Sequence, residues 1–166
     1  MIGYDAYMEL QKTSSSSRVA KARRDAWVAE QIGRTGIDEA VIRSLVDDFY
    51  MKVRSDPVLA PIFAARVSDW SAHLGTMYDF WSGIALMTGR YKGKPLQKHA
   101  PMPLRPAHFT RWLQLFRESA NTVCTPAAAA FFISRAERVA ESLQIGMSGA
   151  EEPLVRCTNL AAANFA

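Results

Sequence analysis

Apolar residues recur at three- and four-residue steps along most of this chain, which is the period of one face of an α-helix. The clearest stripe lies between Thr35 and Asp56, and its members are Ile42, Leu45, Val46, Phe49, Tyr50 and Val53. Thr35 with Asp38 three residues later has the form of a capping box that would begin this helix. The Asp56-Pro57 pair disfavours its continuation beyond Ser55. The stripe therefore predicts an amphipathic helix, followed over 57–63 by a turn with one short helical turn.

Three further segments carry the same period. The first follows a cap at Ser68 or Asp69, the second begins at Pro106, and the third begins with Thr125 as its cap and ends at Gly146. Their apolar faces are Trp70, His73, Leu74, Met77, Trp81, Ile84 and Ala85; Phe109, Trp112, Leu113, Phe116, Ala120 and Val123; and Ala129, Phe132, Ile133, Ala136, Ala140 and Leu143. No segment has the alternating pattern of a strand, so we expect an all-α fold.

The two ends of the chain are less strongly patterned. Residues 18–32 are expected to form a helix that Gly33 ends, after a flexible or capping serine run at 14–17. Residues 147–166 hold a short final helix at most. We therefore expect one main domain with an extension at either end.

Several classes of protein are disfavoured by what the sequence lacks. No apolar run approaches the length of about 18 residues that a membrane span requires, and residues 1–10 lack the apolar stretch of a secretory signal. Cys124 and Cys157 stand too far apart for CxxC spacing. Phosphate-loop, dinucleotide-binding, HExxH and GxSxG motifs are all missing. These observations favour a cytoplasmic protein without a disulfide framework or a structural zinc site.

Positive charge is concentrated in one part of the chain. Residues 80–117 contain no Asp or Glu and carry seven basic residues, namely Arg90, Lys92, Lys94, Lys98, Arg105, Arg111 and Arg117. Such a local field suits an anionic partner such as a phosphate or a carboxylate. A solvated surface would give the same pattern, and charge alone does not separate the two interpretations.

The three histidines have different surroundings in the sequence. His108 opens a helix and is expected near solvent, whereas His73 lies on an apolar stripe, where a core histidine is the simpler interpretation. His99 follows a short helical piece, 95–99, and precedes a proline-rich loop. A neutral imidazole on a short constrained segment is a suitable axial ligand for haem iron. Several aromatic residues could form the walls of a flat cofactor site, although an ordinary aromatic core would look the same.

A family resemblance favours the haem interpretation. Residues 49–63, with Phe49-Tyr50 and Val53-Arg54-Ser55-Asp56-Pro57, resemble the end of the B helix and the following turn of truncated haemoglobins. Residues 70–83 resemble their E helix, 91–99 the segment that carries the proximal histidine, and 109–116 their G helix. The order and spacing of these pieces resemble the third group of the family, across roughly residues 37 to 145.

This resemblance implies a truncated globin fold, a two-over-two helical sandwich around haem b. It divides the chain into an N-terminal helical extension (1–36), a globin domain (37–146) and a C-terminal tail (147–166). It also implies that His99 is the proximal iron ligand and that Phe63, Met77, Trp81 and His73 contact the haem. Tyr50, His73 and Trp112 would face a diatomic ligand. Lys98, Arg105 and Arg111 are candidates for the haem propionates.

Two functional hypotheses follow. In the first, the protein binds oxygen, nitric oxide or carbon monoxide reversibly, with nitric oxide dioxygenation or peroxide chemistry if a reductase supplies electrons. In the second, it is a redox or gas-sensing module in which His73 is the sixth iron ligand. A haem-free helical interaction domain is a third, weaker alternative. We expect neither nucleic acid nor a membrane as a partner.

Overall fold

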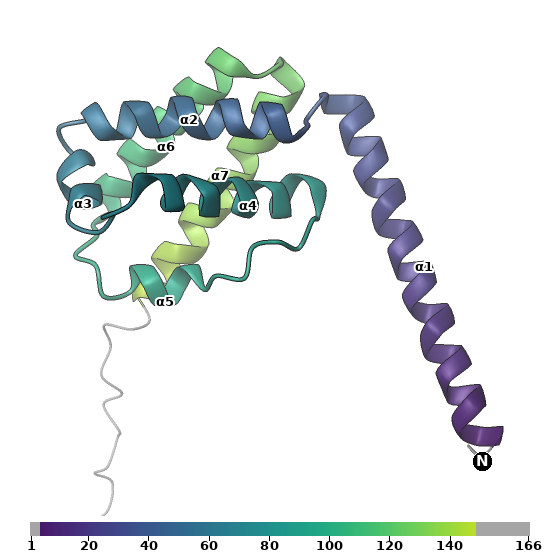
Figure 1. The fold of residues 1–166 in the computed structure, drawn as a ribbon. Coiled ribbons are helices and arrows are strands. Elements are labelled where there is room, and N and C mark those ends of the chain that lie inside the picture. The colour runs from purple at the N-terminus through teal and green to yellow at the C-terminus, as the bar shows by residue number, and fades with distance from the viewer. Residues whose placement is uncertain (1–3, 149–166) are drawn as a thin grey trace, which may run out of the picture.

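The structure is a computed structural model that describes the backbone of residues 4–148 and the side chains from residue 17 onward (Figure 1). Within that range it contains helices and no strands, as the sequence predicts. The helices are α1 (Tyr4–Thr35), α2 (Glu39–Ser55), α3 (Ala60–Ala64), α4 (Trp70–Leu86), α5 (Pro95–His99), α6 (Pro106–Val123) and α7 (Pro126–Ser148). Most of the predicted C-terminal tail lies outside the described residues. No helix in this range is long and apolar enough to cross a membrane.

Four helices form the two-over-two sandwich that was expected. Helix α2 packs against both α4 and α6, and α6 packs against α7. In Figure 1, α2 and α4 run side by side, and α6 and α7 cross behind them. The two short helices, α3 and α5, lie at the edges of this sandwich, where they complete the walls of a cavity described below.

The core forms where the predicted apolar stripes meet. All six members of the α2 stripe are buried, and Phe116 of α6 and Phe132 of α7 are fully buried against them. Trp81 of α4 stacks on Phe116 with ring centroids 4.8 Å apart and meets Phe132 edge to face. Large aromatic side chains bury the most apolar area per residue, so this cluster stabilises the junction of three helices.

Side-chain caps fix the beginnings of three helices. Asp38 accepts a hydrogen bond from the Val41 N–H at 2.8 Å to begin α2, and Asp69 does the same for α4 through Ala72. Thr125 Oγ1 accepts from the Ala128 N–H at the start of α7. The predicted capping box with Thr35 at the start of α2 is wrong. Thr35 is instead the last residue of α1, because Gly36, at φ +71°, turns the chain between the two helices.

Helix α1 is longer than the sequence predicted. It runs through the serine run at 14–17, which we expected to precede the helix, and through Gly33, which we expected to end it. Its C-terminal end is held by tertiary contacts that the pattern does not reveal. Thr35 and Gln31 are buried, and Thr125 Oγ1 donates to the Thr35 carbonyl at 3.0 Å. The rest of α1 extends away from the sandwich (Figure 1). Helix α7 likewise continues two residues beyond the predicted end at Gly146.

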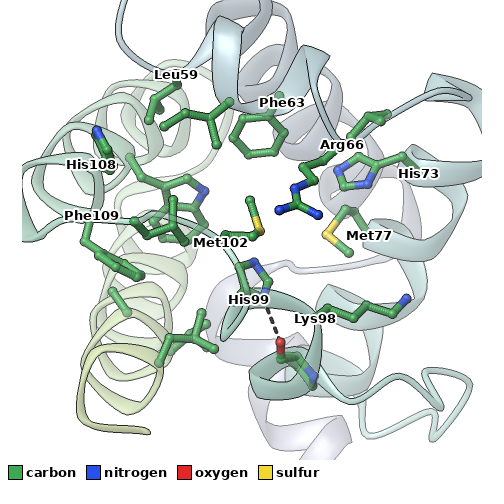
Figure 2. A pocket seen from close by; sticks show the side chains of 18 of the residues that line it. Leu59, Phe63, Arg66, His73, Met77, Lys98, His99, Met102, His108 and Phe109 are labelled. Carbon is green, nitrogen blue, oxygen red and sulfur yellow. Dashed lines mark hydrogen bonds between the residues drawn. The ribbon is translucent and has the colours of Figure 1, made fainter. Parts of the chain in front are cut away.

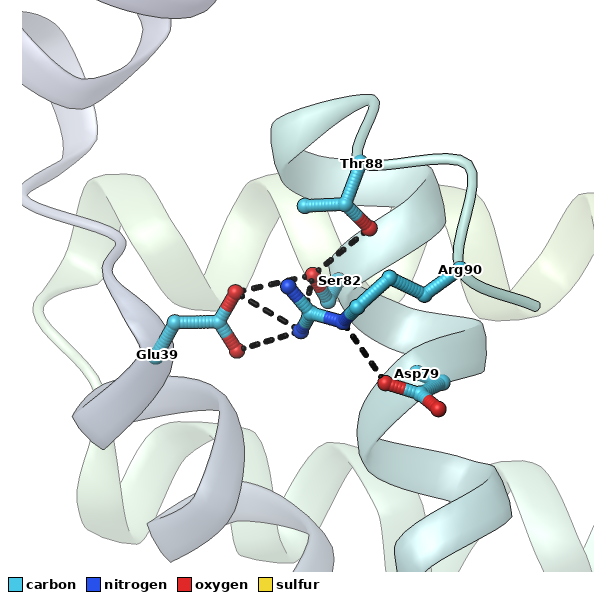
Figure 3. Close-up of polar contacts among 5 residues, drawn as sticks. All are labelled: Glu39, Asp79, Ser82, Thr88 and Arg90. Atoms are coloured by element: carbon cyan, nitrogen blue, oxygen red, sulfur yellow. Dashed lines mark hydrogen bonds and ion pairs between the residues drawn. The ribbon is translucent and has the colours of Figure 1, made fainter.

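A polar cluster anchors the loop that leads from α4 to α5 (Figure 3). Arg90 donates from Nε to Asp79 at 2.7 Å and from a terminal nitrogen to Glu39 at 2.8 Å. The same guanidinium donates to the fully buried Ser82 hydroxyl at 2.8 Å, and that hydroxyl also bonds Thr88. The cluster ties the loop to α2 and α4 before the chain reaches α5.

Candidate functional site

A cavity of about 380 Å³ lies between α4 on one side and α5, α6 and α7 on the others. Its walls contain eight of the ten residues that the sequence analysis assigned to a haem site. These are Tyr50, Phe63, His73, Met77, Trp81, Lys98, His99 and Trp112. The lining is dominated by apolar and aromatic side chains, with a few polar groups converging on the same space, which is the usual composition of a cofactor site.

His99 is the last residue of α5, and its imidazole is directed into the cavity (Figure 2). Its Nδ1 lies 2.7 Å from the backbone carbonyl oxygen of Pro95. A carbonyl oxygen only accepts, so Nδ1 carries the proton and donates it. In the tautomer with this proton on Nδ1, the lone pair lies on Nε2, which is the atom a metal would bind. The short helix begins at Pro95, whose fixed backbone geometry suits the first turn of a helix.

His73 faces the same cavity from α4 (Figure 2). Its Nε2 is buried and has no hydrogen-bond partner among the described residues. Burial lowers the pKa of His73, and the positive charge of the nearby Lys98 lowers it further. The ring is therefore held neutral. A buried polar nitrogen without a hydrogen-bond partner lowers the stability of a folded protein. This atom therefore indicates a partner that the protein chain does not supply.

Aromatic contacts fix the positions of Tyr50 and Trp112 in the cavity wall. The Tyr50 ring meets those of His73 and Phe63 edge to face, with centroids 4.9 and 5.8 Å apart. Burial raises the pKa of Tyr50 far above its ordinary value, so its hydroxyl stays protonated and can donate a hydrogen bond. Trp112 is stacked on Phe116 at 5.3 Å, which fixes the plane of an indole whose N–H is also a donor.

Charged residues near the cavity differ from the sequence expectation. Arg111 does not line the cavity, because its guanidinium is paired with the buried carboxylate of Asp56 at 2.7 Å. Arg105 is also absent from the lining. Lys98 lines the cavity as expected, and Arg66 lines it too, with its guanidinium directed inward (Figure 2). We therefore remove Arg111 from the candidate site and add Arg66.

The pairing of Arg111 with Asp56 serves the fold. Asp56 also accepts from the backbone N–H groups of Val58 and Leu59. Burial alone would raise the pKa of Asp56, but these hydrogen bonds and the Arg111 charge together hold it below its ordinary value. The ionised side chain thus fixes the turn that leads into α3, which carries Phe63.

The sequence analysis missed several residues of the lining, among them Arg66, Tyr91, Met102, His108 and Phe109. His108, expected near solvent, is half-buried and lines the cavity, while its Nδ1 accepts from the Arg105 backbone N–H at 3.1 Å. Because His108 is the third residue of α6, its hydrogen bond to the N-cap residue Arg105 was predictable from the sequence. Met102 lies between Pro101 and Pro103 in a loop without helical periodicity, so no pattern in the sequence indicated its position.

The histidines of the cavity suit the iron of a haem better than a bare metal ion. Between residues 4 and 148 there is no group of three or more His, Cys, Asp or Glu side chains able to hold a bare metal ion. Haem supplies four equatorial nitrogens and needs only an axial imidazole from the protein. His99 Nε2, with its proton-bearing nitrogen already committed to Pro95, offers that ligand. The unpartnered His73 Nε2 faces the same space.

Comparisons with known proteins agree with this geometry. The family model of bacterial-like globins matches residues 30–142. The chain belongs to the bacterial-like globin family, whose membership implies a haem cofactor.

Within that family its similarity is to the third group of truncated haemoglobins, which confirms the resemblance found in the sequence. The chain is 39% identical over 113 residues to the group 3 truncated hemoglobin of Campylobacter jejuni, an alignment that covers 65% of this chain and 89% of that protein. The crystal structure of a group III truncated hemoglobin from the same organism superimposes with a TM-score of 0.63 at 37% identity, covering 67% of this chain and 91% of that one. A hemoglobin of Chloroflexus aurantiacus shares the fold, with a TM-score of 0.57 at 24% identity and coverage of 70% and 95%.

Proposed function

We propose that this globin holds haem b through His99 and binds a diatomic ligand reversibly on the side that His73 and Tyr50 face. The observation that carries the proposal is the pair of imidazoles in one cavity. One has its Nδ1 committed to Pro95, and the other has a buried Nε2 without a partner. The sequence has no CxxCH motif, so attachment would be non-covalent, as in haem b.

When bound, the haem would supply an iron centre that takes up oxygen, nitric oxide or carbon monoxide. The protein chain supplies the surroundings. Tyr50 and Trp112 offer an O–H and an N–H donor to a polar ligand, while Phe63, Met77 and Trp81 give apolar contact to a flat ring. Arg66 and Lys98 are the cations that we assign to the propionates, because both line the cavity.

We assign His73 the role of a gate over the ligand side. Its ring is neutral and is packed edge to face against Tyr50, Phe63 and Trp70, with centroids 4.9 to 6.2 Å apart. Tyr50 and Trp112 already provide two donors, so a bound ligand does not depend on His73 for its stabilisation. Rotation of the His73 ring would then open or close access. Nitric oxide or peroxide detoxification would follow if an electron donor keeps the iron reduced.

The alternative function, a redox or gas-sensing module, makes His73 the sixth iron ligand. The unpartnered Nε2 favours it, because coordination would satisfy that atom. The two functions differ in the spectrum of the ferrous protein without added ligand. An open site gives a high-spin spectrum, whereas two axial imidazoles give a low-spin one.

The test is the absorption spectrum of the purified full-length protein in its ferric, ferrous and carbon monoxide forms. Wild type should take up haem in a one-to-one ratio, and His99→Ala should lose most of it. His108→Ala is the matched control, since His108 also lines the cavity but its Nδ1 accepts a backbone hydrogen bond. An unchanged spectrum and affinity in His99→Ala would refute the proximal assignment.

A further inference from the structure

The structure divides the seven basic residues of 80–117 into two groups. Three of them are paired with carboxylates from other parts of the chain, Arg90 with Glu39 and Asp79, Arg111 with Asp56, and Arg117 with Glu137. The other four make no ion pair within residues 17–148, and all four are exposed, namely Lys92, Lys94, Lys98 and Arg105. The basic residues without an acidic partner are therefore not distributed evenly over residues 80–117.

Three of these four cations lie on seven consecutive residues that end beside His99. Leu96 lies among them and is 41% exposed. We call Lys92, Lys94, Leu96 and Lys98 the α5 surface. An apolar centre bordered by charges of one sign is the arrangement typical of a protein-docking surface with an acidic partner.

The α5 surface is fixed to the body of the globin. A Cβ added at Gly146 of α7 would lie 2.7 Å from the Leu96 Cδ1, so the Leu96 side chain packs directly on Gly146. The Arg90 cluster holds the preceding loop to α2 and α4. A rigid surface loses little conformational entropy when a partner binds, which favours docking.

The position of this surface indicates what kind of partner it receives. Lys98 lines the cavity and directly precedes His99, so a protein on the α5 surface would sit next to the residue that we assign to the iron. Three unpaired lysines within seven residues form a short basic segment rather than the extended row of cations that a nucleic-acid backbone requires.

We propose that the α5 surface docks an acidic protein that donates single electrons, such as a reduced flavoprotein. One electron would leave the donor and reduce the haem iron from ferric to ferrous, with no bond made or broken. This inference rests on the proposed haem function and identifies where its electrons arrive.

The experiment uses the full-length haem-loaded protein and a reduced flavodoxin, a small acidic flavoprotein, as the probe. Stopped-flow absorption measures the second-order rate of haem reduction at ionic strengths from about 10 mM to about 500 mM, because screening separates charge-guided encounter from other causes. Lys92→Glu/Lys94→Glu should slow reduction at least tenfold at low salt and should abolish its salt dependence. Leu96→Gln should slow it without changing the salt dependence.

The matched control is Arg23→Glu/Arg24→Glu, which makes the same change in net charge on exposed residues of α1. It should change the rate less than twofold. Lys92, Lys94, Arg23 and Arg24 do not line the cavity, so the carbon monoxide spectrum of both double variants should match wild type. A nuclear magnetic resonance titration with oxidised flavodoxin should place the perturbed amides on the α5 surface.

Three results would overturn the docking inference. Equal slowing by both double variants would mean that net charge alone governs the rate, and no slowing by either would mean that the surface is not used. Tighter binding of phosphatidylglycerol vesicles or duplex DNA than of flavodoxin, lost in the α5 double variant, would assign the surface to a membrane or a nucleic acid. Failure of wild type to take up haem would instead refute the proposed function itself.

Discussion

The rings of Tyr50 and His73 meet edge to face with their centroids 4.9 Å apart, although 23 residues of chain separate them. This contact joins Tyr50 of α2, the proposed hydrogen-bond donor to the bound ligand, to His73 of α4, the proposed gate for ligand entry. The two side chains differ in chemistry, because one is a phenol held protonated and the other an imidazole held neutral by burial. Substitutions at the two positions should therefore affect different steps of ligand binding.

Replacing Tyr50 by Phe should accelerate oxygen release about tenfold. The reason is the loss of one hydrogen bond to a polar ligand, which contributes about 1.5 kcal/mol when the acceptor carries charge. Trp112→Phe should act in the same direction. Oxygen dissociation rates measured by stopped flow test this, with carbon monoxide as the control ligand because it is a weaker acceptor. A dissociation rate that neither substitution changes would show that these donors do not reach the ligand.

Replacing His73 by Leu should change the rate of ligand association more than the rate of oxygen release. A gate controls access, whereas Tyr50 and Trp112 are expected to stabilise the bound state. Flash photolysis of the carbon monoxide form measures the association rate directly. If the wild-type ferrous protein is instead low-spin, and His73→Leu converts it to high-spin, the redox or sensing function replaces the gate.

His73 should also make the stability of the protein depend on pH. Its pKa is lowered in the folded state, so the unfolded chain binds a proton more readily. Stability is then complete above the ordinary histidine pKa of about 6.5 and falls as the pH drops below it. Urea denaturation at pH 7.5 and pH 5.5 should show a larger loss for wild type than for His73→Leu. Equal losses in the two proteins would contradict the buried neutral imidazole.

Arg66 and Lys98 should slow the loss of haem. An ion pair near the surface contributes less than about 1 kcal/mol, so Arg66→Ala and Lys98→Ala should each raise the rate of haem transfer to an apomyoglobin about threefold. Arg105→Ala is the control, since Arg105 is exposed and does not line the cavity. Faster loss in the control than in the two variants would place the propionates elsewhere.

Asp56 should matter for stability rather than for ligand chemistry. Asp56→Ala removes the ion pair with Arg111 and two backbone hydrogen bonds from a buried turn. We expect the free energy of unfolding to fall by about 2 kcal/mol. Glu137→Ala, which removes an exposed pair with Arg117, should have little effect. A similar loss in both variants would contradict the special role of the buried carboxylate.

The projecting part of α1 should be dispensable for haem binding. Deletion of residues 1–26 keeps the buried Gln31 and Thr35, which hold the end of the helix against the sandwich. The shortened protein should keep the wild-type carbon monoxide spectrum, while its self-association, measured by analytical ultracentrifugation, tests a role for the extension. Loss of haem on this deletion would show that the removed part of α1 helps to close the cavity.

Local periodicity was sufficient to predict the helices of the sandwich, because each buries one face whose residues recur at helical steps. The caps at Asp69 and Thr125 and the start of α6 at Pro106 were predictable for the same reason, since they depend on neighbouring residues only. The selection of His73 and His99 as site residues also followed from the sequence, but only through the resemblance of ordered segments to a known family. Periodicity alone gave no reason to separate His73 from an ordinary core histidine.

The tertiary structure decided the contacts between distant segments. Whether Arg111 meets a propionate or Asp56 depends on the packing of α6 against the turn before α3, 55 residues away in the chain. The inward direction of Arg66, the position of Met102 and the extension of α1 through Gly33 depend in the same way on neighbours that no local pattern specifies. The sequence alone determined which segments are helical and which face each one buries, because both follow from interactions within a few residues. Which charges remain unpaired beside His99 was decided only when the helices came together.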